Sequence, residues 1–186
     1  MKIPALHADI LCLDVAFANL GIAIWNQRQQ KFSHGQVLTT TPEKKSGGKR
    51  HVYVSDDNVR RCQHLADELV AIMARFGTRT VLAEMPTGGG QNSKAVQAMG
   101  MALAVVSAVC ALRGVSLHTI QPSETKKLVG AKGNGKIDKV LVQNFIEKIQ
   151  PGFLSAFNKG QREHVADAAI CIEIARRSPY LRGLLK

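Results

Sequence analysis

Hydrophobic and polar positions in the first part of the chain predict three strands. Residues 10–15 and 20–26 are apolar runs separated by a polar turn at Asn19, a pattern typical of a β-hairpin. A further strand at about 32–40 would extend the hairpin into a meander. The polar segment 39–58 that follows is rich in threonine, lysine and glycine, and it predicts an exposed loop.

The rest of the chain alternates helices with strands. A helix capped by Asp57 or Asn58 and ended by Gly77 would place six residues on one buried face: Val59, Cys62, Leu65, Leu69, Ile72 and Met73. The segment 94–112 is apolar on all sides, so it predicts a central helix. The remaining elements expected are strands at 79–85 and 115–120, a short helix from Pro122 or Ser123, and helices over 136–150 and 164–177. This order indicates a mixed α/β fold.

Length and charge narrow the class of protein. With 186 residues, the chain is expected to form a single domain over 1–186. It has 25 Lys and Arg against 14 Asp and Glu, so its net charge is +11 and its pI is near 9.8. Such an excess favours a polyanionic partner, above all nucleic acid.

The cysteines and the N-terminus bear on the compartment. Cys12, Cys62, Cys110 and Cys171 lie far apart and form no CxxC pair, so we expect buried thiols in a reducing, cytoplasmic setting. The start of the chain predicts no signal peptide, and no segment is expected to span a membrane.

Three carboxylates stand in unusual places. Asp14 lies within an apolar strand, Glu84 ends the strand at 79–85, and Asp167 lies on a helix that is otherwise apolar. Each alone could be a hydrogen-bonded buried acid. If neighbouring strands and a packed helix bring them together, they repel one another unless a cation neutralises them.

His164 strengthens the case for a metal. Its i, i+3 spacing from Asp167 puts both side chains on one helix face. Carboxylates with one imidazole suit Mg²⁺ or Mn²⁺, whereas zinc would call for more cysteine or histidine.

Four stretches resemble the RuvC family of Holliday-junction resolvases, within the ribonuclease H-like superfamily. The segment LCLDVAFANLGIAIW resembles that family's first strand pair, with Asp14 followed seven residues later by Gly21, and VLAEM resembles its second acidic strand. The closest match is 122–142, which resembles a Pro-Ser-x-x-Lys-Lys stretch followed by a Gly-Asn-Gly turn and a basic helix start. The segment HVADAAICIEIA is similar to the family's C-terminal acidic helix, where members have Asp or His at the position of His164.

The resemblance implies a fold and an activity. The fold would be ribonuclease H-like, a five-stranded mixed sheet with helices on both faces. The activity would be metal-dependent cutting of four-way (Holliday) junctions or related branched DNA by a homodimer, which leaves 5′-phosphate and 3′-hydroxyl ends. Four residues would hold two Mg²⁺ or Mn²⁺ ions about 3.5 to 4 Å apart: Asp14, Glu84, His164 and Asp167. No small-molecule substrate is expected.

The chain also departs from the family pattern. Ala16 stands where the family usually has glycine, and about two extra residues precede KGNG. Thr87, followed by Gly88, Gly89 and Gly90, replaces an aromatic residue that family members use to engage the open junction.

Basic residues cluster around the glycine turn. A phosphate could approach the backbone at Gly133 and Gly135, and five lysines surround this turn: Lys126, Lys127, Lys132, Lys136 and Lys139. They are the candidate DNA contacts, although a solvated helix face would have the same composition.

Two alternatives remain open. The first hairpin also resembles the phosphate loop of actin-like ATP-binding phosphotransferases, but those proteins need two such domains. A junction-binding protein of the same fold that no longer cuts DNA is the other alternative.

Overall fold

The computed structural model describes residues 9–43, 52–85, 92–130 and 139–185. Its strands are β1 (Ile10–Asp14), β2 (Asn19–Asn26), β3 (Lys31–Thr39), β4 (Thr80–Glu84) and β5 (Ser116–Ile120). Its α-helices are α1 (Val54–Arg75), α2 (Ser93–Arg113), α3 (Pro122–Val129), α4 (Lys139–Ile149) and α5 (Lys159–Arg177). Two short 3₁₀ turns, Leu154–Ala156 and Arg182–Leu185, complete the list of described elements.

The five strands form one mixed sheet in the order β3-β2-β1-β4-β5. The β1–β2 and β2–β3 pairs are antiparallel, and the β1–β4 and β4–β5 pairs are parallel. Strands β1 and β4 are therefore central, and their carboxyl ends meet at the same edge of the sheet. The predicted meander, the five strands and the mixed sheet are confirmed.

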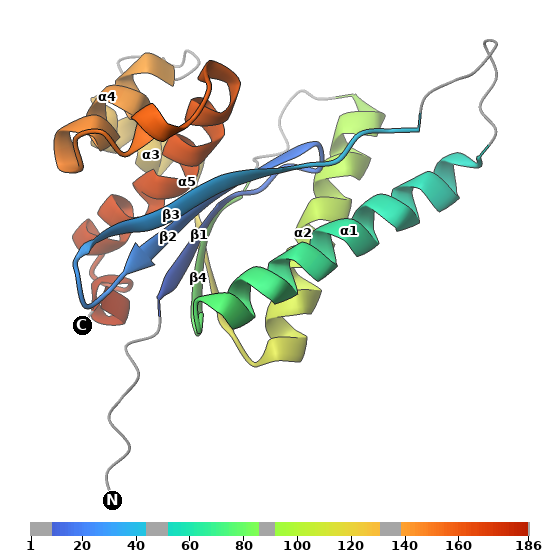
Figure 1. Cartoon of the computed structure of the whole chain (residues 1–186), viewed down its shortest axis with the longest axis horizontal. Coiled ribbons are helices and arrows are strands. Elements are labelled where there is room, and N and C mark those ends of the chain that lie inside the picture. Colours follow the sequence, from blue (N-terminus) through green and yellow to red (C-terminus); the bar gives the residue numbers. More distant parts are fainter. Residues whose placement is uncertain (1–8, 44–51, 86–91, 131–138, 186) are drawn as a thin grey trace, which may run out of the picture.

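Helices cover both faces of the sheet, as predicted (Figure 1). On one face, Leu11, Leu13 and Ile22 pack with apolar residues of α1 and α2. On the other face, Cys12 and Trp25 pack against α5, which α3 and α4 flank. This alternation along β1 follows from the twofold period of a strand, and both sets are buried because the strand lies in the middle of the sheet.

Helix α1 begins earlier than predicted. It starts at Val54, so Asp57 and Asn58 lie within its first turns instead of capping it. Asp57 is almost fully buried at 1% exposure, whereas Val59, predicted on the buried face, is 54% exposed. The reason is that the first two buried positions of this helix carry polar side chains, Asp57 and Arg61, which an apolar pattern does not reveal.

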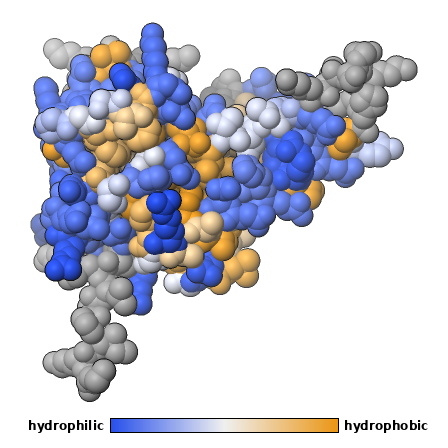
Figure 2. All heavy atoms as spheres, viewed as in Figure 1, coloured by the Kyte–Doolittle hydropathy of each residue, from blue (hydrophilic) through white to orange (hydrophobic). Residues whose placement is uncertain are grey.

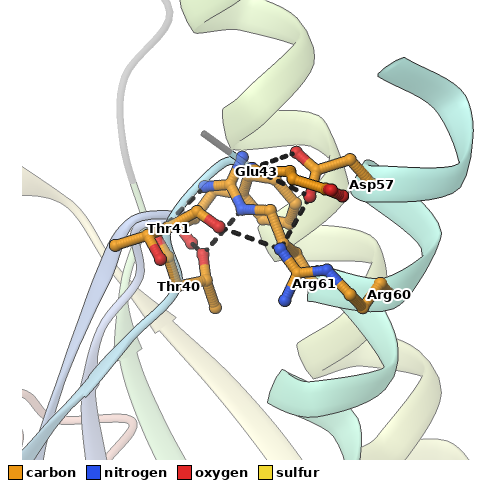
Figure 3. Close-up of polar contacts among 7 residues, drawn as sticks. Thr40, Thr41, Glu43, Asp57, Arg60 and Arg61 are labelled. Atoms are coloured by element: carbon orange, nitrogen blue, oxygen red, sulfur yellow. Dashed lines mark hydrogen bonds and ion pairs between the residues drawn. The ribbon is translucent and has the colours of Figure 1, made fainter. Parts of the chain in front are cut away.

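Those polar side chains fasten α1 to the loop that leaves β3 (Figure 3). The Asp57 carboxylate accepts hydrogen bonds from the Glu43 backbone N–H at 3.3 Å and from Arg60 at 2.6 Å. Arg61 donates to the hydroxyl of Thr40 at 3.0 Å, and its guanidinium lies 4.1 Å from the centre of the Phe17 ring. Because Phe17 lies three residues after Asp14, the last residue of β1, this network also fixes the turn beyond Asp14.

Helix α2 was predicted to be central, but only one side of it is buried. Its buried residues are Ala102, Val106, Val109 and Cys110, while Leu103 is 42% and Leu112 is 88% exposed. One side of α2 packs on the sheet and α1, and an apolar side is left uncovered. Helix α2 is long and apolar enough to cross a membrane by length and composition alone. Core helices of soluble proteins also meet these two criteria. The absence of a membrane span therefore stays a prediction.

Two further details of the sequence-based prediction change. Helix α5 begins at Lys159 instead of 164, because Asn158 and Gln161 form a reciprocal capping box ahead of the apolar stretch. Cys12, Cys110 and Cys171 are buried as predicted, but Cys62 is only half-buried. All four cysteines are free thiols.

Candidate active site at the carboxyl edge of the central strands

Asp14 and Glu84 end the two central strands side by side. They are the last residues of β1 and β4, and they are direct partners in the parallel register. The strand continues no further at either position, so both side chains lie at the rim of the sheet on the α5 side. The structure thus places Asp14 and Glu84, two of the three acids that the sequence analysis singled out, side by side.

Helix α5 brings His164 to the same edge. Its Nδ1 atom lies 2.9 Å from Oδ2 of Asp14, and the side chains of His164 and Asp14 are 24% and 22% exposed. This approach depends on Gly21, the register partner of Asp14 on β2. A Cβ atom at Gly21 would stand 2.2 Å from the backbone carbonyl oxygen of His164, so only glycine lets α5 come this close.

Glu84 is held by a residue that the sequence analysis did not single out. Thr125 of α3 is 1% exposed, and its hydroxyl donates a hydrogen bond to Oε2 of Glu84 at 2.7 Å. Thr125 lies on the same helix face as the apolar residues Leu128 and Val129, at i+3 and i+4. A threonine at a core-facing helical position was the signal that could have identified it.

Asp167 lies one helical turn beyond His164, and its pKa depends on burial and on the charges of the other two acids. Burial and the negative charges of Asp14 and Glu84 raise its pKa to about 7, against the opposing effect of Lys139 and His164. Burial also raises the pKa of Glu84 to about 6, with the charge of Asp14 adding to it and the Thr125 hydrogen bond opposing it. Neighbouring negative charge therefore contributes to the raised pKa values of Glu84 and Asp167, beside the larger effect of burial.

The chemistry of these donors suits a divalent cation. Within the described parts of the chain, no three such side chains are already gathered around one point as metal ligands. Instead, Asp14 and Glu84 are engaged with His164 and Thr125. The raised pKa values of Glu84 and Asp167 are compatible with a set of metal ligands, since a bound cation would favour the ionised carboxylates. Carboxylate oxygens with one imidazole fit Mg²⁺ or Mn²⁺.

The predicted DNA-contacting lysines are only partly described. Lys126 and Lys127 occupy the last turn of α3, where Lys127 is exposed and Lys126 half-buried. Lys139 begins α4, forms an ion pair with Glu163 and lowers the pKa of Asp167. Lys132 and Lys136 lie outside the described residues, as do Thr87 and 88–90.

No protein-family model matches the sequence, and no curated protein matches it. Solved structures do match. A Thermus thermophilus RuvC in complex with a Holliday junction substrate has a TM-score of 0.64 at 17% identity, over 92% of this chain and 96% of that one. A second Thermus thermophilus RuvC structure has a TM-score of 0.63 at 17% identity, over 91% and 95%. The yeast mitochondrial Holliday junction resolvase Ydc2 has a TM-score of 0.60 at 14% identity, over 96% and 85%.

At these identities the likeness concerns the fold. It extends over 92% and 96% of this chain. The chain has the ribonuclease H-like fold of the RuvC Holliday-junction resolvases, as the resemblance of its motifs predicted.

Proposed function

We propose that the protein is a metal-dependent, structure-specific DNA endonuclease of the resolvase type. Its substrate would be a four-way junction or related branched DNA, cut by paired nicks that leave 5′-phosphate and 3′-hydroxyl ends. One observation carries the proposal: Asp14 and Glu84 end adjacent parallel strands, with His164 of α5 bonded to Asp14. The fold shared with junction resolvases supports this reading.

Asp14, Glu84, His164 and Asp167 would hold two Mg²⁺ or Mn²⁺ ions. Bound in this way, the ions would supply an activated water and would stabilise the oxygen that leaves the phosphorus. The chain's own residues orient this set. His164 fixes the direction of the Asp14 carboxylate, and Thr125 fixes that of Glu84. Because burial raises the pKa values of Glu84 and Asp167, we expect metal binding to release protons near neutral pH.

Basic residues around α3 and α4 would bind the phosphate backbone. Lys126 and Lys127 are carried on α3, the same helix that supplies Thr125 to the candidate site. Lys139 lies beside Asp167, so a phosphate near the metal ligands would be within its field. With a net charge of +11, we expect DNA binding that weakens steeply with salt.

We further propose a homodimer formed by the uncovered side of α2. Val96 and Leu103 lie two helical turns apart on this helix and are 49% and 42% exposed. Exposed apolar side chains that gather on one side of a helix are typical of a surface that binds a partner. Two strands of a four-way junction are equivalent, and a twofold axis would present one active site to each. Leu103→Glu should give a monomer that nicks without coupling, while Leu141→Glu, a control of similar exposure on α4, should remain a dimer in sedimentation.

We also propose that residues 1–186 form one nuclease domain and that the protein is cytoplasmic. Four free thiols without a disulfide are typical of a reducing compartment.

Asp14→Asn separates binding from cutting. The amide removes a negative charge that faces phosphate, so the variant should bind a labelled junction at least as tightly as the parent while losing nicking activity. Asp67→Asn, an exposed position on α1, is the control and should cut normally. A parent chain that binds junctions but never nicks them would instead identify a non-cleaving junction-binding protein.

A further inference from the structure

A hollow lies between α3 and the end of α5, and none of the candidate metal ligands lines it. Its volume is about 440 Å³, and Lys127 and Leu128 of α3 line it together with Ile174 and Arg177 of α5. Tyr180, just beyond α5, completes its wall and is 92% exposed. The hollow therefore combines an apolar floor, two cations and an exposed aromatic ring.

The charges around the hollow favour an anionic ligand. Arg177 and Lys127 are both exposed, and the segment 176–186 carries three arginines and one lysine with no acid. One carboxylate, that of Glu124, also lines the hollow. It accepts a hydrogen bond from the Gln121 backbone N–H at 2.8 Å as part of the α3 cap, so it is committed to the helix.

The position of the hollow connects it to the candidate active site. Arg177 follows Asp167 by ten residues on one helix, a rise of about 15 Å. Leu128, which lines the hollow, lies one helical turn after Thr125 on the same face of α3, and the Thr125 hydroxyl donates a hydrogen bond to Glu84. A DNA strand that leaves the metal site along the α3–α5 side would pass over this hollow.

We propose that the hollow binds a segment of single-stranded DNA, with a base stacked on Tyr180 and its phosphates beside Lys127 and Arg177. Stacking on an aromatic side chain between cations is the usual way in which proteins hold unpaired strands. Inside a duplex both faces of a base are covered by its neighbours, so along a paired arm Tyr180 finds no open base face, whereas each base of an unpaired segment offers one.

This inference rests on the proposed nuclease function and narrows its substrate. Branched DNA with a single-stranded arm, such as a fork or a flap, would engage both the metal site and the hollow. A four-way junction with fully paired arms would engage only the metal site and the lysines. The protein should therefore prefer a branched substrate with one single-stranded arm.

The test measures binding in EDTA, where no cutting takes place. Two labelled substrates are used: a four-way junction, and the same junction with one arm made single-stranded. The affinity of each substrate is measured for the parent chain, for Tyr180→Ala and for Tyr53→Ala. Tyr53 is the matched control, a tyrosine that is 80% exposed and lies ahead of α1. The parent and Tyr53→Ala should bind the junction with the single-stranded arm about tenfold more tightly than the fully paired junction. Tyr180→Ala should bind the two junctions equally.

A fluorescence measurement checks the contact directly. The chain has one tryptophan, Trp25, which is 1% exposed, so in Y180W an exposed tryptophan would report on the hollow alone. Oligothymidylate should quench this signal.

Equal binding of both substrates by the parent, or an unchanged preference in Tyr180→Ala, overturns the inference and leaves the nuclease proposal standing. Quenching by an acidic peptide with a terminal phenylalanine, but not by oligothymidylate, overturns it in favour of a protein partner. A parent that binds no branched DNA at all overturns both proposals.

Discussion

Asp167→Asn should stabilise the metal-free protein while abolishing its activity. The asparagine has nearly the same shape as the aspartate but carries no charge. Burial and the charges of Asp14 and Glu84 raise the pKa of Asp167 from 3.8 to about 7, so the folded state holds this carboxylate at a cost in free energy at pH 8.

The magnitude follows from that rise in pKa. At about 1.4 kcal/mol per pH unit, the rise from 3.8 to about 7 corresponds to about 4 kcal/mol at most. Burial is the largest cause of the raised pKa, and the asparagine amide must also be desolvated, so we expect about half of this figure, about 2 kcal/mol, or a melting temperature higher by about 4 to 8 °C for a domain of this size.

The dependence on pH has a definite sign. A raised carboxyl pKa means that the folded state binds more protons than the unfolded state, so the stability of the parent falls as pH rises from about 4 to 7. The advantage of Asp167→Asn should therefore be full at pH 8 and should shrink as pH falls toward 4. Mg²⁺ at pH 8 should stabilise the parent more than the variant.

Thermal melts in EDTA and in Mg²⁺, at pH 5 and pH 8, measure these effects. Asp67→Asn is the matched control, because Asp67 is exposed on α1, and it should melt like the parent under all four conditions. If Asp167→Asn melts at or below the parent temperature at pH 8 in EDTA, burial and the neighbouring charges do not disfavour the ionised Asp167 carboxylate as argued.

Two further substitutions test how the site is held in place. Gly21→Ala would put a Cβ atom 2.2 Å from the carbonyl oxygen of His164, so it should lower the free energy of unfolding by about 1 to 3 kcal/mol and remove most of the nicking activity. Urea denaturation measures the stability. The control is Gly100→Ala on α2, where the added Cβ meets nothing within 4 Å, and it should show no loss of stability. Thr125→Val keeps the side-chain shape but removes the hydrogen bond to Glu84, so calorimetry should find weaker Mn²⁺ binding with an unchanged fold, and equal affinity would make Thr125 a packing residue only.

The sheet and its two acids, Asp14 and Glu84, could be predicted because their signals are local. Strand residues alternate between two buried faces, so a central strand appears in the sequence as an apolar run. An acid within such a run, as at Asp14, or at its end, as at Glu84, stands out against it. The i, i+3 spacing of His164 and Asp167 likewise needs only a helix.

The features that could not be predicted depend on contacts between distant segments. The start of α1 was missed because its first buried positions carry Asp57 and Arg61, whose partners at Thr40 and Glu43 come from another element. The uncovered side of α2 was missed because an apolar composition says nothing about which side the sheet covers. Thr125 was missed because its hydroxyl is explained only by Glu84, at a separation of 41 residues.

The decisive measurement is the cutting of a labelled four-way junction by the purified chain in Mg²⁺, in Mn²⁺ and in EDTA. We expect paired nicks with 5′-phosphate and 3′-hydroxyl ends in Mg²⁺ or Mn²⁺, none in EDTA, and none with Asp14→Asn in either metal. Nicking that persists in EDTA, or that survives in Asp14→Asn at the parent rate, would contradict a metal-dependent nuclease built on these carboxylates.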